Sequence, residues 1–343
     1  MNSFTSIEIC AGAGGQALGL EQAGFEHLAL VEWEPLACET LRHNRPQWNV
    51  VQGDVRAFSA TSYKGGVDLF AGGVPCPPFS IAGKQLGQDD ERDLFPEALR
   101  LIEECSPRAI LLENVRGLLS PKFTLYRQTI QHQLAEMGYW SSWRVLNASD
   151  FGVPQLRPRA ILVGLKRELM PYFDWPSPID SQPVTVGHAL VNHMREAGWE
   201  LADAWKLQAN GIAPTLVGGS KKHGGADLGP TRARKAWASL GVDGGSLSNF
   251  PPQPGDVKMP KLTLAMAATI QGFPESWHIV GKKTPAYRQV GNAFPPPVAK
   301  AVGEAIKSAL QNYKSATTQP DEWKNRQKDK AQRPNYGPIF TQG

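Results

Sequence analysis

Short apolar segments alternate with helix-like stretches between residues 5 and 165, and this alternation constrains the fold more than any other feature of the sequence. The segments are bounded by glycine, proline or polar residues, which is typical of strands buried on both faces of a sheet. Strands are expected at 6–12, 27–33, 67–73, 108–115 and 159–165, and helices at 15–23, 35–44, 91–105 and 123–137. Such alternation predicts an α/β fold with a doubly wound, mostly parallel sheet.

The chain becomes less regular after residue 166. Proline, glycine and tryptophan are frequent until about residue 261, which indicates a smaller, loop-rich domain. Regular spacing returns at 262–271 and at 298–310, and the second stretch is an amphipathic helix expected to pack on the first domain through Val298, Val302, Ile306 and Leu310. We therefore predict a main domain of residues 1–165 plus 275–311, a small domain of 166–274, and a disordered basic tail over 312–343.

Composition excludes several classes of protein. No run of about 18 apolar residues occurs and the N-terminus does not resemble a secretory signal, so neither a membrane span nor export is expected. The four cysteines, Cys10, Cys38, Cys76 and Cys105, include no C-x-x-C pair. Their spacing argues against a metal site and a disulfide framework, and favours a reduced, cytoplasmic protein.

The net charge of +4 identifies no partner, but basic residues cluster between 205 and 235. Lys221 and Lys222 lie at the centre of this cluster. A local basic surface on a slightly acidic body is suited to phosphate. A solvated loop explains a charge run equally well, so both interpretations stay open.

A glycine-rich turn follows the first expected strand, at Ala11, Gly12, Gly14 and Gly15. Glycines allow close approach of a ligand, and a helix N-terminus favours a negative group. Glu32 lies at the end of the strand expected at 27–33, and Asp54 follows a third, short strand that precedes Gly53; a carboxylate at such a position can bind ribose hydroxyls. The pattern indicates an adenosine-type cofactor, either a dinucleotide or S-adenosylmethionine, and an ordinary tight turn is the alternative.

Three further strand ends carry residues with chemical potential. Cys76 lies between prolines, in a stiff loop suited to hold a nucleophilic thiol, whereas Cys38 and Cys105 are interpreted as buried small side chains. Glu113 lies near the end of the strand expected at 108–115 and, if buried, is a candidate proton donor, with a helix cap or salt bridge as the alternative. Arg157 and Arg159 have the i, i+2 spacing that directs two guanidinium groups the same way on an extended segment, toward a phosphate or carbonyl oxygen.

Taken in order, these segments resemble the motifs of the cytosine-C5 DNA methyltransferase family. GGVPCPPFSIAGKQ (72–85) resembles the nucleophile loop, ENV (113–115) the acidic motif, and QLRPR (155–159) the basic motif. LTLAMAATIQGFP (262–274) resembles the segment that closes the variable region, and AYRQVGNAFPPPVAKAV (286–302) the last cofactor-site motif. The resemblance covers roughly 7–165 and 262–310. It implies the fold of S-adenosylmethionine-dependent methyltransferases, with residues 166–274 as the target-recognition domain.

The resemblance also implies roles for individual residues. Cys76 attacks C6 of a cytosine flipped out of double-stranded DNA, Glu113 protonates N3, and Arg159 contacts the base. The residues expected to bind the cofactor, S-adenosylmethionine, are Ala11, Gly12, Gly14, Gly15, Glu32, Trp33, Asp54, Val55, Asn292 and Ala293. Those expected to face DNA are Ser80, Arg157, Thr215, Leu216, Lys221 and Lys222, with Arg157 either a phosphate contact or a support. No metal is expected. The compact length of the chain resembles that of bacterial modification enzymes. The resemblance therefore implies a cognate restriction endonuclease that acts on the same DNA site. One chain contains every expected motif, so a monomer is expected to suffice for activity.

Three positions depart from the family pattern. Cys10 stands where Phe is usual, Pro77 where Gln is usual, and Ala265-Met266 where an Arg-Glu pair is usual. The first change reduces the area available to pack on adenine, whereas the last concerns domain orientation more than catalysis. Three alternatives remain: a tRNA cytosine-5 methyltransferase of the same fold, a dinucleotide-dependent oxidoreductase, and a non-catalytic DNA-binding homologue.

Overall fold

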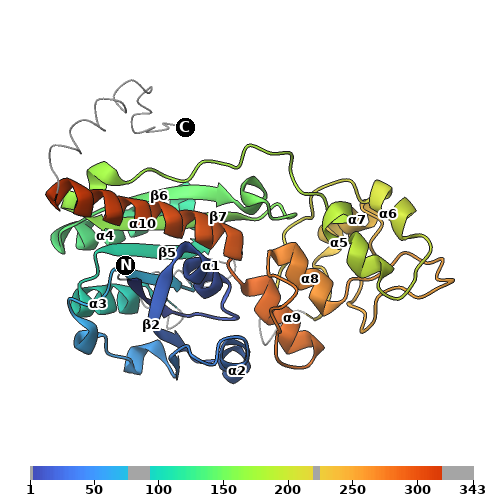
Figure 1. Ribbon diagram of the computed structural model, residues 1–343, viewed down its shortest axis with the longest axis horizontal. Coiled ribbons are helices and arrows are strands. Elements are labelled where there is room, and N and C mark those ends of the chain that lie inside the picture. Colours follow the sequence, from blue (N-terminus) through green and yellow to red (C-terminus); the bar gives the residue numbers. More distant parts are fainter. Residues whose placement is uncertain (1–2, 76–92, 219–224, 319–343) are drawn as a thin grey trace.

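The computed structural model describes residues 3–75, 93–218 and 225–318. Within these residues a seven-stranded sheet runs through the main domain in the order β3-β2-β1-β4-β5-β7-β6 (Figure 1). β1 to β5 pair in parallel, whereas β7 is antiparallel to both β5 and β6. The strands are β1 (Phe4–Ile9), β2 (Phe25–Glu32), β3 (Val50–Gln52), β4 (Leu69–Gly73), β5 (Ala109–Val115), β6 (Tyr139–Asn147) and β7 (Pro158–Lys166). The expected α/β fold with a mostly parallel sheet is confirmed.

The β6 strand was not expected from the sequence. It lies at the sheet edge and pairs only with β7 among the described strands. Most of its side chains are half-buried or exposed, so its segment, YWSSWRVLN, lacks the continuous apolar run of a strand buried on both faces. A short loop that includes a 3₁₀ turn at Ala148–Phe151, rather than a crossover helix, joins β6 to β7. The two strands therefore run antiparallel.

Helices cover both faces of the sheet. They are α1 (Gly15–Ala23), α2 (Pro35–Asn44), α3 (Phe95–Cys105), α4 (Thr124–Glu136) and α10 (Pro296–Thr318). Ile7 and Ile9 of β1 share a buried cluster with α3 and α4, whereas Leu69 and Ala71 of β4 share one with α1 and α10. The α1 and α10 helices meet at Gly19, where a Cβ atom would lie 2.4 Å from the Pro296 carbonyl oxygen. Glycine is therefore needed for this close helix contact.

The α10 helix carries the apolar face predicted for 298–310, and all four of the expected residues are buried against the main domain. It continues to Thr318, so the prediction that the tail is unstructured from residue 312 is wrong for 312–318. The added turns are held by Tyr313, whose ring packs edge-on against Tyr172 with centroids 5.8 Å apart. The rest of the predicted tail lies outside the described residues.

The small domain contains more helix than its sequence suggests. Five helices lie in and beside it: α5 (Val186–Arg195), α6 (Ala202–Gln208), α7 (Thr231–Ser239), α8 (Leu264–Gln271) and α9 (Lys283–Asn292). Its loops are fixed by buried tryptophans, since Trp199 Nε1 donates to the Asp256 carbonyl at 2.7 Å and Trp205 Nε1 to the Gly241 carbonyl at 2.9 Å. Tryptophans that anchor loops do not repeat at helical spacing, which explains the weak periodicity.

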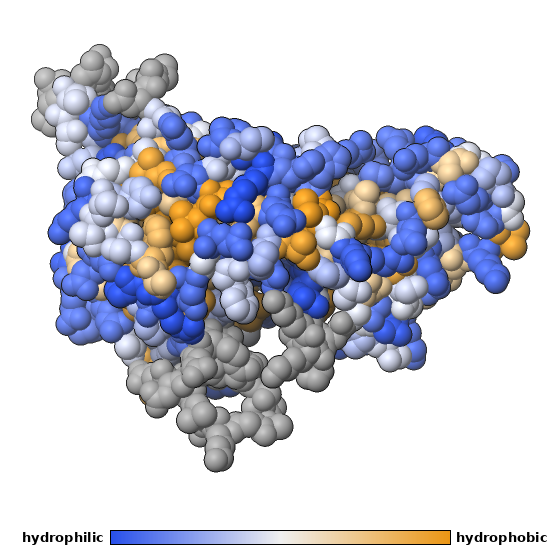
Figure 2. Space-filling view, turned by 90° about the horizontal axis from the view of Figure 1, so that it is seen from below, coloured by the Kyte–Doolittle hydropathy of each residue, from blue (hydrophilic) through white to orange (hydrophobic). Residues whose placement is uncertain are grey.

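The small domain extends from the main domain as a narrower lobe (Figures 1 and 2). Hydrophilic side chains cover most of the face drawn in Figure 2, and apolar side chains are gathered in a band along its middle. The two parts share one core, in which Trp205 and Trp237 of the small domain belong to the same buried cluster as Leu18 and Leu41. Within the described residues, no helix combines the length and apolar character needed to cross a membrane.

His27 is a buried titratable group that makes stability depend on pH. Its Nε2 lies 2.9 Å from the Ala17 carbonyl and its Nδ1 lies 2.8 Å from the Ser6 hydroxyl, and burial lowers its pKa. A lowered pKa stabilises the fold above the ordinary pKa of histidine, and this contribution is lost as the pH falls through the folded value. We expect urea unfolding between pH 7.5 and 5 to show a smaller loss of stability in His27→Gln than in the wild type. If both proteins lost the same free energy of unfolding, His27 would be excluded as a source of the pH dependence.

Candidate active site

A cleft of about 1360 Å³ opens at the carboxyl ends of the central strands. Its walls come from the turn after β1, the end of β2, the loop after β3, the ends of β4 and β5, and the junction between α9 and α10. Open α/β sheets bind ligands at this edge because the loops that follow parallel strands converge there. The cleft therefore brings together most of the residues singled out from the sequence.

The glycine-rich turn has little room for side chains. A Cβ atom on Gly15 would lie 2.1 Å from the Phe294 carbonyl oxygen, and Gly14 adopts a φ of 83° in contact with Leu41 and Trp277. Gly12, in contrast, has a φ of 55°, and a Cβ atom placed on it would meet no neighbour closer than the Cys10 carbonyl oxygen at 4.0 Å, so this side of the turn is open. Since α1 starts at Gly15, the unpaired N–H groups of its first turn suit an anionic ligand group.

Glu32 braces this turn in addition to lining the cleft. Its Oε2 accepts a hydrogen bond from the Gly12 N–H at 2.7 Å, and its Oε1 accepts from Trp33 and Glu34 N–H groups at 2.9 and 2.8 Å. Burial raises the pKa of Glu32, and these three backbone hydrogen bonds act in the opposite direction. The carboxylate therefore joins the ends of β1 and β2, a role that the sequence did not reveal. The neighbouring Trp33 side chain stands at the cleft wall, 67% exposed.

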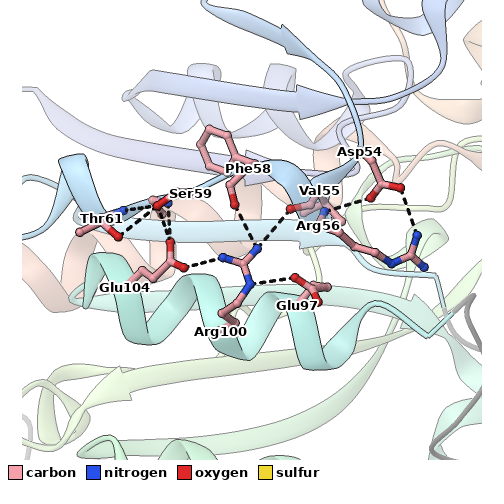
Figure 3. A network of polar contacts seen from close by, with 10 residues as sticks. Asp54, Val55, Arg56, Phe58, Ser59, Thr61, Glu97, Arg100 and Glu104 are labelled. Atoms are coloured by element: carbon pink, nitrogen blue, oxygen red, sulfur yellow. Dashed lines mark hydrogen bonds and ion pairs between the residues drawn. The ribbon is translucent and has the colours of Figure 1, made fainter.

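The loop after β3 is fixed by ionic contacts (Figure 3). Asp54 caps the 3₁₀ turn Val55–Ala57 by accepting from the Arg56 N–H at 2.9 Å, and it pairs with the Arg56 guanidinium at 3.1 Å. Arg100 of α3 donates to the carbonyls of Val55 and Phe58 at 3.3 and 3.0 Å. Arg100 is in turn paired with Glu97 and Glu104. This network holds Asp54 and Val55 at the cleft.

Glu113 and Arg159 form an ion pair at the adjoining part of the cleft. Arg159 Nε lies 2.8 Å from Glu113 Oε1, and both side chains are only 12% exposed. Burial raises the pKa of Glu113, and the positive charges of Arg159 and Arg157 limit the rise. The antiparallel pairing of β5 with β7 produces this contact, because it places Val115 opposite Arg159. Glu113 lies two residues before Val115, so its side chain is on the same face of the sheet as that of Arg159. Glu113 is thus a buried carboxyl with increased affinity for its proton.

The segment expected to hold the nucleophile begins at the end of β4, where Gly73 is paired with Glu113. Asn114 Nδ2 donates to the Val74 carbonyl at 2.8 Å, which joins the ends of β5 and β4. A Cβ atom on Gly73 would lie 3.5 Å from Glu113 Oε2 and 3.8 Å from the Cys10 carbonyl, so the absent side chain leaves space between the two halves of the cleft. Four expected site residues, Cys76, Ser80, Lys221 and Lys222, lie outside the described residues, as does Pro77.

Arg157 and Arg159 have different partners, since Arg159 pairs with Glu113 whereas backbone carbonyls hold Arg157. Arg157 is buried and donates to the carbonyls of Leu216 at 2.7 Å, Gly291 at 2.7 Å and Ala293 at 3.0 Å. Leu216 is also buried, with its N–H bonded to Gln155. This corrects the expectation that Arg157 and Leu216 face DNA. Arg157 instead ties the predicted recognition segment to the α9–α10 junction, which corresponds to the supporting role considered above.

The remaining expected residues line the cleft at its other wall. Thr215 is half-buried, and its hydroxyl donates to the Leu156 carbonyl at 2.5 Å. Asn292 is exposed and Ala293 buried at the end of α9. Within the described ranges, no group of three or more His, Cys, Asp or Glu is placed to hold a metal ion.

The cleft residues that were not predicted include three buried or half-buried polar side chains, Glu8, Gln16 and Arg288. The sequence pattern around Glu8 could have indicated a cleft residue, since an acidic residue interrupts an otherwise apolar strand, SIEIC. Gln16 and Arg288 gave no such indication, because polar residues on a helix are usually solvated. Met266, one of the departures from the family pattern, is buried in α8.

The mixed sheet, with the glycine turn and the Glu113–Arg159 pair in one cleft at its edge, has the fold of the S-adenosylmethionine-dependent methyltransferases. Residues 4–308 match the family model of the C-5 cytosine-specific DNA methylases. The chain belongs to this family and is a DNA cytosine-5 methyltransferase.

Individual relatives agree with this assignment. The chain is 58% identical over 315 residues to type II methyltransferase M.NaeI of Lentzea aerocolonigenes, covering 90% of this chain and 76% of that protein. It is 57% identical over 311 residues to type II methyltransferase M.NgoMIV of Neisseria gonorrhoeae, covering 90% of this chain and 98% of that protein. A crystal structure of a prophage-encoded putative DNA modification methyltransferase (E. coli) aligns with a TM-score of 0.66 at 26% identity, covering 90% of this chain and all of that one. A crystal structure of a Spodoptera frugiperda DNMT2 mutant aligns with a TM-score of 0.62 at 18% identity, covering 90% of this chain and all of that one, and it shares the fold.

Proposed function

We propose that this enzyme transfers a methyl group from S-adenosylmethionine to C5 of a cytosine flipped out of a specific double-stranded DNA sequence, as the modification enzyme of a type II restriction–modification system. The observation that carries the proposal is the buried Glu113–Arg159 pair beside the glycine turn, in one cleft. The printed names of the relatives M.NaeI and M.NgoMIV support the type II assignment.

The residues of the cleft suit the cofactor. The open side of Gly12 and the N-terminus of α1 accommodate a carboxylate, while Glu32, Trp33, Asp54 and Val55 surround the space for an adenosine. When bound, S-adenosylmethionine supplies an electrophilic methyl group on a sulfonium. Saturable binding of NAD or NADP with no binding of S-adenosylmethionine, measured by equilibrium dialysis, would overturn this assignment.

The chain's own residues perform the remaining chemistry. The Cys76 thiolate forms a bond to C6 while Glu113 donates a proton to N3, which turns C5 into an enamine carbon. Arg159 holds Glu113 in place and reaches the base from the same wall of the cleft. Once C5 has taken the methyl group and S-adenosylhomocysteine has left, solvent accepts the C5 proton and the bond between C6 and Cys76 breaks with its electron pair returning to sulfur. N3 gives its proton back to the Glu113 carboxylate, which restores the aromatic ring.

A DNA library that contains 5-fluorocytosine tests the whole scheme. Fluorine at C5 cannot leave as a proton does, so the enzyme stays covalently attached to the target site in the presence of S-adenosylmethionine. Sequencing the trapped DNA identifies the recognition sequence, and peptide mapping identifies the nucleophile. A matched tRNA substrate is the comparison. Attachment to tRNA alone would favour a tRNA methyltransferase, and attachment through a residue other than Cys76 would refute the mechanism.

Arg288 extends the proposal to the DNA backbone. Of the described cations that line the cleft, Arg159 pairs with Glu113, Arg56 with Asp54, and Arg157 with carbonyls, while Lys122 Nζ lies 4.7 Å from the centre of the Phe123 ring. Arg288 has no such partner within the described ranges, and its Nε is buried without a hydrogen bond. An uncompensated guanidinium beside the recognition segment suits a phosphate.

We therefore expect Arg288→Gln to weaken DNA binding and to reduce the slope of log affinity against log salt by about 0.9, the value for one lost phosphate contact. Binding of S-adenosylhomocysteine should not change. Lys300→Gln, on the outer part of α10, is the matched control. A salt slope that is the same in Arg288→Gln and the control would exclude a phosphate contact. Filter binding of one DNA site at several salt concentrations provides the measurement.

A further inference from the structure

A buried carboxylate ties the start of α3 to the neighbouring helix α4. Asp93 is 7% exposed, and its Oδ1 accepts a hydrogen bond from the Phe95 N–H at 3.0 Å. The Tyr126 hydroxyl of α4 donates to Asp93 Oδ2 at 2.5 Å. Hydrogen bonds to a charged oxygen are among the stronger ones in proteins, and the N-terminus of a helix favours a carboxylate. The position of the first residues of α3 therefore depends on Asp93 and Tyr126 together.

Aromatic packing holds the Tyr126 ring in place for this contact. The ring meets that of Phe95 edge-on, with centroids 5.9 Å apart, and Trp143 of β6 lies 6.3 Å from Phe95 on the same basis. Phe95 is 1% exposed and belongs to the buried cluster between the sheet and these helices. A ring that is already fixed loses little freedom when its hydroxyl forms a hydrogen bond. The Tyr126 hydroxyl is thus a precise support for Asp93.

The start of α3 is joined in turn to the end of β4, where the chain leads into Cys76. The Leu94 N–H donates to the Pro75 carbonyl at 3.5 Å, and both residues line the cleft. Pro75 directly precedes Cys76 in the sequence, and Asn114 holds the residue before it, Val74. The contact between Leu94 and Pro75 is long, so a small displacement of Leu94 breaks it. The backbone before Cys76 is therefore held from β5 on one side and from α3 on the other.

We propose that Asp93 and Tyr126 are positioning residues for the nucleophile. The inference rests on the proposed function. Neither residue is among the described residues that line the cleft, so both act on the reaction through Leu94 and Pro75 rather than by touching substrate. Bond formation between a thiolate and C6 depends on their alignment, and an error of about 1 Å can lower a rate roughly 100-fold.

The competing explanation is a purely structural one, in which Asp93 caps α3 and the Tyr126 hydroxyl only adds stability. Tyr126→Phe separates the two explanations, because it removes one hydroxyl and keeps the ring that packs on Phe95. The matched control is Tyr139→Phe. The Tyr139 side chain is also buried, and its hydroxyl donates to the Pro107 carbonyl at 2.6 Å, but this contact lies at the opposite edge of the sheet, just before β5 begins.

Single-turnover methyl transfer to target DNA, with DNA and S-adenosylmethionine saturating, provides the test. We expect Tyr126→Phe to lower the rate constant roughly 10- to 100-fold. The affinities for S-adenosylhomocysteine, from calorimetry, and for DNA, from filter binding, should stay at the wild-type values. Tyr139→Phe should keep the wild-type rate, although it too loses a buried hydrogen bond. Asp93→Ala removes the acceptor through which the Tyr126 hydroxyl acts, so adding Tyr126→Phe to it should slow the reaction little further.

An unchanged rate in Tyr126→Phe would overturn the inference and leave the structural explanation. An equal loss of rate in Tyr139→Phe would also overturn it, since the loss would then follow stability rather than place. Independent, additive losses in the double variant would show that Tyr126 does not act through Asp93. If Asp93→Ala does not fold, the comparison of the two tyrosine variants decides the question. If the wild type binds S-adenosylmethionine but transfers no methyl group to DNA, the proposed function itself fails.

Discussion

Cys76→Ser is expected to abolish methyl transfer while leaving the affinity for S-adenosylmethionine nearly unchanged. A serine hydroxyl is far less acidic than a thiol and is a much weaker nucleophile at neutral pH, so bond formation at C6 is lost. In the proposed mechanism the Cys76 side chain bonds to the cytosine and not to the sulfonium, so cofactor binding should not depend on it. Transfer of a labelled methyl group to target DNA measures the first effect, and equilibrium dialysis measures the second.

The other cysteines provide matched controls for this substitution. Cys38 and Cys105 are buried in α2 and α3, and burial raises the pKa of these thiols to about 11 and about 12, so they stay protonated and unreactive. Cys38→Ser and Cys105→Ser should therefore retain methyl transfer in protein that remains folded. Turnover of Cys76→Ser within tenfold of the wild type would refute Cys76 as the nucleophile. Loss of cofactor binding together with turnover would indicate damage to the cleft.

The sheet was largely predictable because parallel strands are buried on both faces and therefore leave apolar runs in the sequence. The antiparallel hairpin at the edge was not, since the exposed side chains of β6 hide its strand character. Yet this hairpin determines the chemistry of the site: β7 places Arg159 next to Glu113 only because it runs antiparallel to β5. A purely local pattern contains no information about the direction of a neighbouring strand.

The candidate site likewise contains some residues that the sequence could identify and others whose role depends on tertiary structure. Strand ends identified Glu32, Asp54 and Glu113 as cleft residues, because topology alone places them there. Spacing did not predict where the Arg157 guanidinium would find its acceptors, which are three carbonyls distant in sequence. These acceptors meet Arg157 only after one segment of the small domain, at Leu216, and the α9–α10 junction have packed against the start of β7. The role of Arg157 therefore belongs to tertiary structure rather than to the i, i+2 pattern.

Glu113→Gln is expected to lower the rate of methyl transfer by roughly 10²- to 10⁴-fold, the usual contribution of a general acid. The amide preserves size but cannot transfer a proton to N3. In the wild type, burial raises the pKa of Glu113, so its carboxyl stays protonated to a higher pH than an exposed glutamate. The rate should therefore fall on the alkaline side as this group loses its proton, and Glu113→Gln should lack that limb.

Arg159→Gln tests the direction of this pKa argument. The Arg159 charge is the largest influence opposing the effect of burial, so its removal raises the pKa of Glu113 further and moves the alkaline limb of the kcat profile to higher pH. The height of the profile also falls, because a contact to the base is lost, but the midpoint of the limb reports the ionisation of Glu113. Single-turnover rates with saturating DNA between pH 5 and 9 measure both. An alkaline limb that persists in Glu113→Gln, or that does not move in Arg159→Gln, would mean that another group donates the proton to N3.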